Sequence, residues 1–467
     1  MTNFDLSTAE RKDLWQYLGD RIDSYLNDTR SLRASPDLDV EGIRRYVVSA
    51  FEAQMDPRSA LDHVLDGLTR YAVHTPHPGY FGLFNPRANY PSIIADAAAA
   101  AFNSQLAAWS HAPFANEVEQ SLIHAFGKKF GYRDADIDGN FTSGGAEANT
   151  TGLLLALNRA FPEYANEGLQ SLDAKPVLYC SSESHHSLVK AARIAGLGMN
   201  AVRQIPVDDR LRISVPHLEE ALHRDLQGGY RPFLIVATAG TTGAGAIDPL
   251  SDLAAIAQRQ KMWLHTDAAY GGAVALLDPE KEMLKGIELS DSITFDAHKW
   301  LSVSMAGSML IARQKNALAE TFRITADYMP QEASALTIVD PYTHSIQWSR
   351  RFIGLKLYLS MLIFGWKGYA EVLRHQMAMG TLMKDELIRS GWRIFNDTAL
   401  PIVCFGKDEF VKDQNMASRI CGKVLGTGKH WISVYNLRGV NTLRACVTNY
   451  ATTEEDVREL VQTVNDQ

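Results

Sequence analysis

The sequence predicts an α/β protein: a large domain with a mainly parallel sheet wrapped by helices, followed by a smaller α/β domain. Three observations predict this class. From about Asn140 to Arg313, short apolar runs alternate with segments of helical periodicity, which is typical of parallel strands joined by helices. The run FLIVATAG at 233–240 is nearly continuously apolar, as expected of a central strand covered on both faces. Beyond about Leu355 a long helical stretch precedes a second group of short strands.

The N-terminal part is predicted to be helical. Ser7 to Glu10 form a capping-box pattern ahead of an amphipathic helix. The apolar residues at helical spacing are Leu14, Tyr17, Leu18, Ile22, Tyr25 and Leu26. This apolar stripe needs a surface to cover, either in this chain or in a second subunit. Residues 74–92 are dense in Pro and Gly and predict an irregular connection, and 92–109 favours a helix.

The strands and helices of the two α/β domains follow in order. The predicted strands of the large sheet are 177–182, 202–207, 233–240, 263–270, 292–297 and 307–312, with helical segments such as 185–196 and 250–260 between them. The predicted elements of the small domain are strands near 391–395, 400–405, 431–436 and 442–447, a helix at 416–426, and a last helix capped by 452–455. The sequence therefore divides into an N-terminal helical segment that supplies a dimer contact (1–88), a large domain (89–355) and a small domain (356–467).

Composition argues against several classes of protein. A net charge of -8 with no Lys/Arg-rich run argues against nucleic acid or a membrane surface as the main partner. The longest apolar runs, such as 357–366, fall short of the ~20 residues that a spanning helix needs, and the N-terminus lacks the pattern of a secretory signal. The four cysteines are widely spaced without a CxxC pair. They predict a cytoplasmic location and form no metal-site pattern.

Polar residues occur where predicted strands end, the edge at which open α/β sheets bind ligands. The segment SGGAEAN at 143–149 opens a helix with two glycines, and its amides would suit a phosphate, although a plain glycine turn is the simpler interpretation of this motif alone. Asp267 ends an apolar strand, where a carboxylate needs a cationic partner or caps the next helix. Lys299 follows the run at 292–297, where a lysine taken alone would be a solvated charge.

Taken together, these groups match the requirements of pyridoxal 5'-phosphate. Its phosphate binds helix amides, its aldehyde binds a lysine amine, and its pyridine nitrogen pairs with a carboxylate that keeps the nitrogen protonated. A flat ring also needs an imidazole above it and a small residue beneath it. Ala269 lies two residues after Asp267 and would point to the same side of a strand.

The chain resembles the pyridoxal phosphate-dependent decarboxylases of the aromatic amino acid and glutamate decarboxylase group, which have the aspartate aminotransferase-like fold (fold type I). The resemblance extends from the HP-x-YF segment at His77 to the last helix. Its most specific parts are LHTDAAYGG at 264–272 and DAHKW at 296–300, followed by TAGTTGAGAID at 238–248 and SGGAEAN at 143–149. The resemblance implies a seven-stranded, mainly parallel sheet in the large domain and a homodimer with active sites at the interface.

The resemblance also implies roles for individual residues around the cofactor. Lys299 would bind the cofactor as an imine, Asp267 would pair with the pyridine nitrogen, and His186 would stack on the ring. The other implied cofactor contacts are Ala269 beneath the ring, Gly144, Gly145 and Ala146 at the phosphate, His298 beside the phosphate, and Thr242 near the ring. At Asp296 some relatives carry asparagine near the phosphate, and an anion there would repel the phosphate unless it faces His298 or backbone donors.

Substrate contacts and the proton donor are likewise implied by the resemblance. Tyr80 and Phe81 match an aromatic pair of the substrate pocket, with plain core packing as the alternative interpretation. Arg444 matches an arginine near the substrate carboxylate, and Trp109 would lie nearby. In relatives, a tyrosine in a mobile loop reaches the partner's site and protonates Cα. Here that position falls on Pro341, so Tyr342 is the predicted donor and His344 the second choice.

The predicted function is pyridoxal phosphate-dependent decarboxylation of an L-amino acid, with a slight preference for an aromatic one. The reaction would pass through an external aldimine and a quinonoid and would release CO2 and the amine. Oxygen-dependent decarboxylation and deamination to an aldehyde stays open, as does a lyase that cleaves a Cα–Cβ bond. A non-catalytic binding protein would have no use for intact Lys299, Asp267 and His186.

Overall fold

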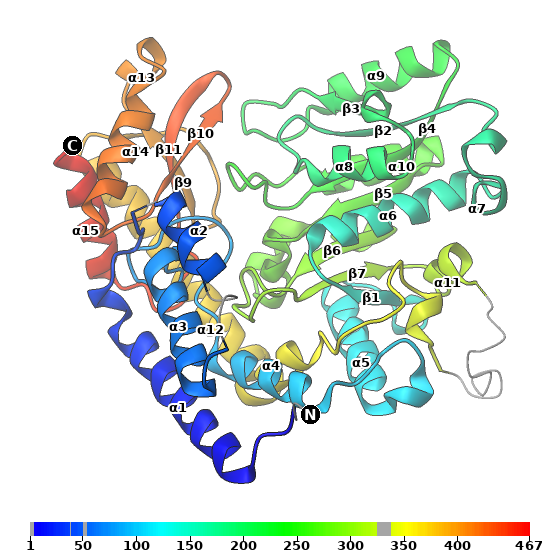
Figure 1. Cartoon of the computed structure of the whole chain (residues 1–467). Helices are drawn as coiled ribbons and strands as arrows, with labels where there is room; N and C mark the ends of the chain where they lie inside the picture. The colour runs from blue at the N-terminus through cyan, green and yellow to red at the C-terminus, as the bar shows by residue number, and fades with distance from the viewer. Residues whose placement is uncertain (1–3, 38, 50–53, 325–337) are drawn as a thin grey trace.

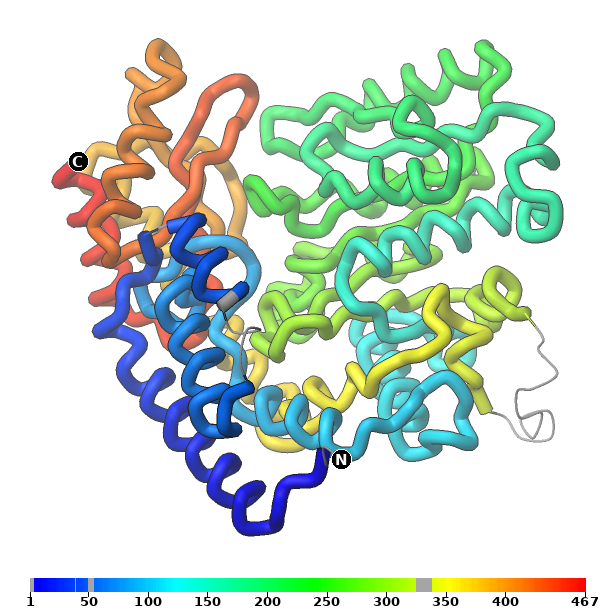
Figure 2. The backbone as a smooth tube through the Cα atoms, in the orientation of Figure 1, coloured from blue at the N-terminus to red at the C-terminus, as the bar shows by residue number. Residues whose placement is uncertain are grey.

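The structure is a computed structural model that describes residues 4–37, 39–49, 54–324 and 338–467. Two sheets lie side by side, a larger one in the middle of the chain and a smaller one near its C-terminus (Figure 1). The blue N-terminal helices lie next to the orange and red C-terminal part, as the backbone trace shows (Figure 2). The N-terminal segment therefore covers the small domain rather than the large sheet.

Three helices form the N-terminal segment: α1 (Thr8–Asp28), α2 (Val40–Ser49) and α3 (Pro57–Tyr71). The predicted capping box is present at the start of α1, because the Ser7 hydroxyl accepts from the Glu10 amide at 3.2 Å and the Glu10 carboxylate accepts from the Ser7 amide at 2.7 Å. An ion pair of 2.8 Å between Arg30 and Asp456 joins this segment to the small domain. Neither α1 nor α3 contains a buried residue.

The large sheet has seven strands. They are β1 (Asp138–Thr142), β2 (Lys175–Ser181), β3 (Val202–Ile205), β4 (Tyr230–Thr238), β5 (Trp263–Asp267), β6 (Ser292–Asp296) and β7 (Ser308–Ala312). Their order is β1-β7-β6-β5-β4-β2-β3. Strand β7 is antiparallel to both of its neighbours, and the other pairs are parallel. The prediction of a seven-stranded, mainly parallel sheet is confirmed.

Helices cover both faces of this sheet. They are α4 (Tyr90–Phe102), α5 (Pro113–Lys129), α6 (Gly145–Ala160), α7 (Tyr164–Glu167), α8 (Ser187–Ile194), α9 (Val215–Gln227), α10 (Leu250–Gln260) and α11 (Ala317–Phe322). In the central strand β4, Ile235 and Ala237 pack with α5, α9 and α10, whereas Leu234 and Val236 pack with α6 and α8. Both faces of β4 are therefore buried, as its continuous apolar sequence predicts.

The small domain has an antiparallel sheet of order β10-β11-β9-β8. Its elements are β8 (Arg393–Ile394), β9 (Ile402–Gly406), β10 (Ser433–Leu437), β11 (Val440–Cys446), α13 (Glu409–Lys412), α14 (Met416–Thr427) and α15 (Glu454–Asn465). The predicted cap of the last helix is made by Thr453, whose hydroxyl accepts from the Asp456 amide at 3.3 Å.

One long helix, α12 (Leu355–Arg389), joins the two domains (Figure 1). Leu357 and Leu373 pack in the core of the large domain, whereas Met379 and Leu387 pack in that of the small domain. Gly365 interrupts the helical backbone at φ 59° and ψ -177°. Among the described residues, no helix is long and apolar enough to cross a membrane.

Candidate active site

Two charged residues lie at the carboxyl ends of adjacent strands. Asp267 is the last residue of β5, and Lys299 follows the end of β6 by three residues. Strands β5 and β6 pair in parallel, with Asp267 opposite Thr294. The Lys299 ammonium lies 3.0 Å from Oδ2 of Asp296, and its side chain is 21% exposed. The lysine is therefore accessible at the edge where a ligand of an open α/β sheet binds.

The Asp267 carboxylate is held by one side chain and one amide. Its Oδ2 accepts a hydrogen bond of 2.8 Å from the amide nitrogen of Asn149, and its Oδ1 accepts one of 3.2 Å from the Ala269 backbone. Because β5 ends at Asp267, Ala269 lies beyond the strand, and strand alternation does not set its direction. Its carbonyl instead accepts from the Asp296 amide at 3.2 Å, which ties it to the end of β6.

The N-terminus of α6 faces the same edge. Gly144 is its N-cap and has open space beside its Cα, while Gly145 and Ala146 are the first two helical residues. Amides at these positions have no partner within the helix and attract anions. A Cβ at Gly145 would lie only 2.8 Å from Asp296 Oδ2, so glycine is needed for this close approach. The amides can therefore hold a phosphate beside Asp296.

Asp296 faces two cationic or titratable side chains. Its Oδ2 lies 3.0 Å from the Lys299 ammonium and 3.8 Å from Nε2 of His298, whose pKa is lowered by burial. The other oxygen, Oδ1, is buried without a hydrogen-bond partner among the described residues. An anion beside a phosphate site requires such neighbours, and the structure supplies them. Together with the helix amides, the lysine and Asp267, this donor and acceptor set fits pyridoxal 5'-phosphate.

Two adjacent histidines, His185 and His186, precede α8, and both are exposed. Burial lowers the pKa of His185, the Asp267 carboxylate raises it, and the Lys299 ammonium lowers it. His186 acts electrostatically on His185 as well, so the pair lies near both key residues of the site. The stacking role of His186 stays a prediction.

The predicted aromatic pair lies in packed surroundings. Phe81 is fully buried in the core of the small domain, with Met383 and Phe405 in the same cluster. This packing favours the alternative of core packing, and the contact of Phe81 with substrate stays a prediction. Tyr80 is 2% exposed, its ring lies 5.4 Å from that of Trp431, and its hydroxyl donates to the Asn85 side chain at 2.7 Å. Tyr80 therefore supports the segment that precedes the site.

Sequence reasoning missed Phe84, which lies three residues further along. Its ring centroid is 5.7 Å from the Lys299 ammonium and 5.2 Å from the guanidinium carbon of Arg444. The ring stacks on Tyr270 at 4.0 Å, and Tyr270 stacks on Trp300 at 4.9 Å. Phe84 follows the pair that was singled out, Tyr80 and Phe81, by three residues, but only the packing distinguishes its direction from that of Phe81.

Arg444 on β11 reaches the site from the small domain. Its Nε donates to the carbonyl of Gly243 at 3.0 Å, Nη1 to that of Gly82 at 3.1 Å, and Nη2 to that of Thr242 at 2.8 Å. The side chain is 2% exposed. Arg444 therefore holds the loop at Thr242 next to the segment that carries Phe84, and most of its hydrogen-bonding capacity is used in doing so.

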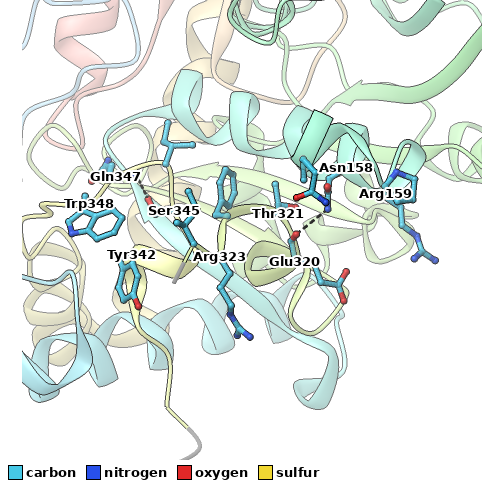
Figure 3. Close-up of a pocket in the computed structure, with 15 residues that line it drawn as sticks. Asn158, Arg159, Glu320, Thr321, Arg323, Tyr342, Ser345, Gln347 and Trp348 are labelled. Atoms are coloured by element: carbon cyan, nitrogen blue, oxygen red, sulfur yellow. Dashed lines mark hydrogen bonds between the residues drawn. The ribbon is translucent and has the colours of Figure 1, made fainter. Parts of the chain in front are cut away.

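Tyr342 lies in the short helical turn Pro341–Thr343. Its amide donates to the Ala107 carbonyl at 3.0 Å, and its ring lies 4.9 Å from that of Trp348. Tyr342 and Trp348 lie at one end of a cavity of about 760 Å³, and Asn158 and Arg159 lie at the other (Figure 3). Gln347, beside Trp348, donates to the Glu147 carboxylate at 2.7 and 2.8 Å, which ties this segment to the first turn of α6.

His344 and Trp109 are also held elsewhere. His344 is buried with its Nε2 4.0 Å from Oδ1 of Asp138, and burial lowers its pKa. Asp138 and Ser292, the first residues of β1 and β6, both pair with Ala312 of β7. His344, which lies beside Asp138, is therefore at the edge where β6 begins, whereas Lys299 of the same chain follows the end of β6. The second choice of proton donor stays a prediction, because the predicted donor acts in the partner's site. The Trp109 amide donates to Asp340 at 2.7 Å and its indole to Glu117 at 2.7 Å. Residues 325–337 of the predicted mobile loop lie outside the described part of the chain.

The fold and the site together define a fold-type I pyridoxal phosphate enzyme: a mainly parallel sheet carries a helix N-terminus, a carboxylate and an accessible lysine at one edge. Comparison with known proteins agrees. The model of the family described as "Pyridoxal-dependent decarboxylase conserved domain" matches residues 44–407. The chain belongs to this family. It is an enzyme that uses pyridoxal phosphate to decarboxylate an amino acid.

Individual relatives are similar over most of their length. An aromatic-L-amino-acid decarboxylase of Bacillus atrophaeus is 27% identical over 99% of this chain and 96% of that protein. One of Cavia porcellus is 30% identical over 86% of each. The crystal structure of Oryza sativa TDC with PLP and tryptamine superimposes with a TM-score of 0.93 over 100% of this chain and 99% of that chain, at 23% identity. The last comparison shows the shared fold.

Proposed function

We propose that this chain decarboxylates an aromatic L-amino acid to the amine, with Lys299 and Asp267 binding opposite ends of one pyridoxal phosphate ring. The observation that carries the proposal is the convergence of the Lys299 ammonium, the Asp267 carboxylate and the His185 imidazole at one edge of the sheet. When bound, the cofactor withdraws electrons from the α-carbon of the substrate as CO2 leaves.

The residues of the chain bind and orient this cofactor. Lys299 supplies the amine for its aldehyde, and the amides of Gly144, Gly145 and Ala146 bind its phosphate. An ionised Asp267 keeps the pyridine nitrogen protonated, because opposite charges stabilise each other strongly away from water. We propose His186 as the residue that stacks on the ring, with His185 beside it, and Ala269, Thr242 and His298 as neighbours of the ring and the phosphate.

An aromatic substrate is supported by the wall that faces Lys299. Phe84 presents a ring to the lysine, and that ring is backed by the stack of Tyr270 and Trp300. Arg444, the cation beside Phe84, already donates to three backbone carbonyls, which makes it a poor ligand for an acidic side chain. The names of the two curated relatives point to the same class of substrate.

The proposed enzyme is a homodimer. Helix α1 has 21 residues and none of them is buried. Leu14 and Leu18 of α1 and Leu61 of α3 help to line an apolar groove of about 440 Å³, and Trp15 beside them is 58% exposed. A helix with no buried residue and an exposed apolar stripe is stabilised by packing on a second copy. Light scattering in solution tests this directly, since a monomeric mass at micromolar concentration would contradict it.

A second copy also gives Tyr342 a role. We propose that Tyr342 acts as proton donor across the dimer interface, as the resemblance implies. His344 remains the second choice. The four cysteines are free and buried, which supports a cytoplasmic location for the dimer.

The experiment that tests the proposed function is a panel of amino acids assayed in air and under nitrogen, with CO2, amine, aldehyde and ammonia all measured. We expect CO2 and an equal amount of amine from an aromatic substrate, with no dependence on oxygen. Aldehyde with ammonia and consumption of oxygen would overturn the amine as product. Turnover of acidic amino acids only would overturn the substrate class but not the use of the cofactor.

A further inference from the structure

Alternate residues of β5 and β6 are polar on the face that α6 covers. They are Trp263, His265 and Asp267 on β5, and Ser292, Thr294 and Asp296 on β6. Central parallel strands are ordinarily apolar on both faces. The opposite face of β5 and β6 is mainly apolar, with Leu264, Ile293 and Phe295, and its one polar residue, Thr266, is paired with Ser290 at 2.7 Å. A stripe of six alternate residues with polar groups on one face needs a reason, because each of its groups must find a hydrogen-bond partner.

The hydrogens of this stripe can be assigned from one end. The Trp263 indole can only donate, and it donates to Oγ of Ser292 at 2.8 Å. The Ser292 hydroxyl donates to Nδ1 of His265 at 2.8 Å, because the other ring nitrogen, Nε2, faces the acceptor oxygen Oδ1 of Asn149 and must carry the hydrogen. Burial lowers the pKa of His265 to about 4, so the ring is neutral near pH 7 and carries its one hydrogen on Nε2. Only one tautomer of His265 satisfies these bonds.

The chain of hydrogen bonds continues to the active site. Nε2 of His265 donates to Oδ1 of Asn149 at 3.0 Å, and the hydroxyl of Thr294 donates to the same oxygen at 2.7 Å. The amide nitrogen of Asn149 then donates to Oδ2 of Asp267 at 2.8 Å and to Oγ of Ser187 at 2.9 Å. The chain of hydrogen bonds therefore ends at two groups, the Asp267 carboxylate and Ser187, the first residue of α8.

We infer that Asn149 and His265 are positioning residues that fix the orientation of the Asp267 carboxylate for the pyridine nitrogen of the cofactor. His265 fixes the side-chain amide of Asn149 so that its NH2 group faces Asp267, and Asn149 holds one carboxylate oxygen in place. Hydrogen bonds in such a buried chain polarise one another and stabilise a negative charge at its end. The inference rests on the proposed pairing of Asp267 with the ring nitrogen.

Gly152 of α6 makes this arrangement possible. A Cβ at Gly152 would lie 2.7 Å from both Nδ1 and Cε1 of His265, closer than real contacts allow. The helix therefore needs glycine here so that the imidazole can reach Asn149, one turn earlier on the same helix. Gly152→Ala displaces the His265 ring without removing a polar group, and it is an independent test of the same chain.

The test measures cofactor binding and a pH titration rather than turnover alone. Asn149→Ala, His265→Leu and Gly152→Ala are prepared without cofactor, and the visible band of lysine-bound pyridoxal phosphate is followed as the cofactor is added and as the pH is changed. We expect Asn149→Ala to weaken cofactor binding by about 10-fold to 100-fold, the effect of losing one hydrogen bond to a charged group. The pH midpoint of the band should move upward, because the ring carries less positive charge near the lysine nitrogen.

Two further variants separate positioning from stability. His265→Gln keeps a donor near the place of Nε2 and should restore binding and the pH midpoint toward the native values, whereas His265→Leu should not. Tyr179→Phe removes a buried hydrogen bond of 2.7 Å to Asp225 outside the site, and it should lower the melting temperature without changing either readout.

The outcomes are distinguishable. If Asn149→Ala and Gly152→Ala lower only the melting temperature, as Tyr179→Phe does, the positioning role is overturned. Should Asn149→Ala fail to fold, His265→Gln and Gly152→Ala decide the question on the same two readouts. Absence of the visible band in the native protein would instead overturn the proposed function.

Discussion

The ammonium nitrogen of Lys299 lies 3.0 Å from the carboxylate of Asp296, which ends the strand before it. The same carboxylate lies against Gly145, at the helix end proposed to bind a phosphate. An amine must lose its proton before it can attack an aldehyde, and an adjacent carboxylate favours the protonated form. Asp296 therefore opposes two steps of cofactor binding, the approach of the phosphate and the reaction of the lysine.

Asp296→Asn should strengthen the binding of pyridoxal phosphate relative to pyridoxal. Removing one negative charge near the phosphate is expected to raise the ratio of the two affinities by about 10-fold, as measured by titration of the cofactor-free protein. Pyridoxal lacks the phosphate and reports the effect on Lys299 alone. An equal change for both compounds would show that Asp296 does not act on the phosphate.

Lys299→Ala should abolish turnover and the visible band of the bound cofactor together, because no other amine replaces the lost one at the end of β6. Absorbance after addition of pyridoxal phosphate and CO2 release from the best substrate are the measurements. A band that survives in this variant would place the covalent bond at another lysine, and peptide mapping after borohydride reduction would identify it.

Asp267→Asn should still bind the cofactor but react roughly 100-fold or more slowly, since a neutral amide does not keep the pyridine nitrogen protonated. Single-turnover kinetics with the reconstituted protein separate this loss of rate from a loss of binding. Turnover near that of the native enzyme would contradict the role assigned to Asp267.

The two adjacent histidines form a matched pair of variants. His186→Ala should lower kcat by roughly 2-fold to 10-fold, the range of an aromatic stacking contact. His185→Ala removes the adjacent imidazole and should lower kcat less. A larger loss in His185→Ala would assign the stacking role to His185 instead.

Acid should destabilise the protein through His430, which lies outside the site. This residue is 2% exposed, both of its ring nitrogens lack partners among the described residues, and burial lowers its pKa to about 4. A histidine with a folded-state pKa below its ordinary value stabilises the folded state above pH 6.5 and loses that contribution as the pH falls toward 4. The slope is at most about 1.4 kcal/mol per pH unit for one such group.

The control for this pH effect is His430→Phe. Denaturant unfolding of the cofactor-free protein at fixed concentration, between pH 6.5 and 4, should give a flatter dependence in the variant than in the native chain. Parallel slopes in the two proteins would assign the acid sensitivity to other groups.

Much of the large sheet could be predicted because buried strands are apolar. The run at 233–240 became β4, and the motifs after 263 and 292 marked the ends of β5 and β6. Strand β1, with the sequence DGNFT, was missed because it holds a single large apolar residue. The antiparallel direction of β7 could not be predicted either, since direction depends on the connection and leaves no mark in the composition of a short strand.

The site was predicted where chemistry restricts the residue type, and less well where only packing decides. Asp267 and Lys299 were recognisable as charges at strand ends, whereas His185 and His186 are identical in type and adjacent, so composition alone does not assign the stacking role to one of them. A readable signal was also missed: the alternating polar residues of WLHTD and SITFD, at 263–267 and 292–296, are unusual for central strands and marked the chain that leads to Asp267.

Phe81 and Phe84 are three residues apart, yet each is anchored in a different core. Because only two residues separate them, the packing of Phe81 in the small domain affects the position of Phe84 in the wall proposed to contact the substrate. A cavity-forming change deep among the partners of Phe81, such as Met383→Ala, will therefore alter which side chains the enzyme accepts, although no atom of Met383 belongs to the pocket. Screens for altered selectivity should recover such remote positions alongside those that line the pocket itself.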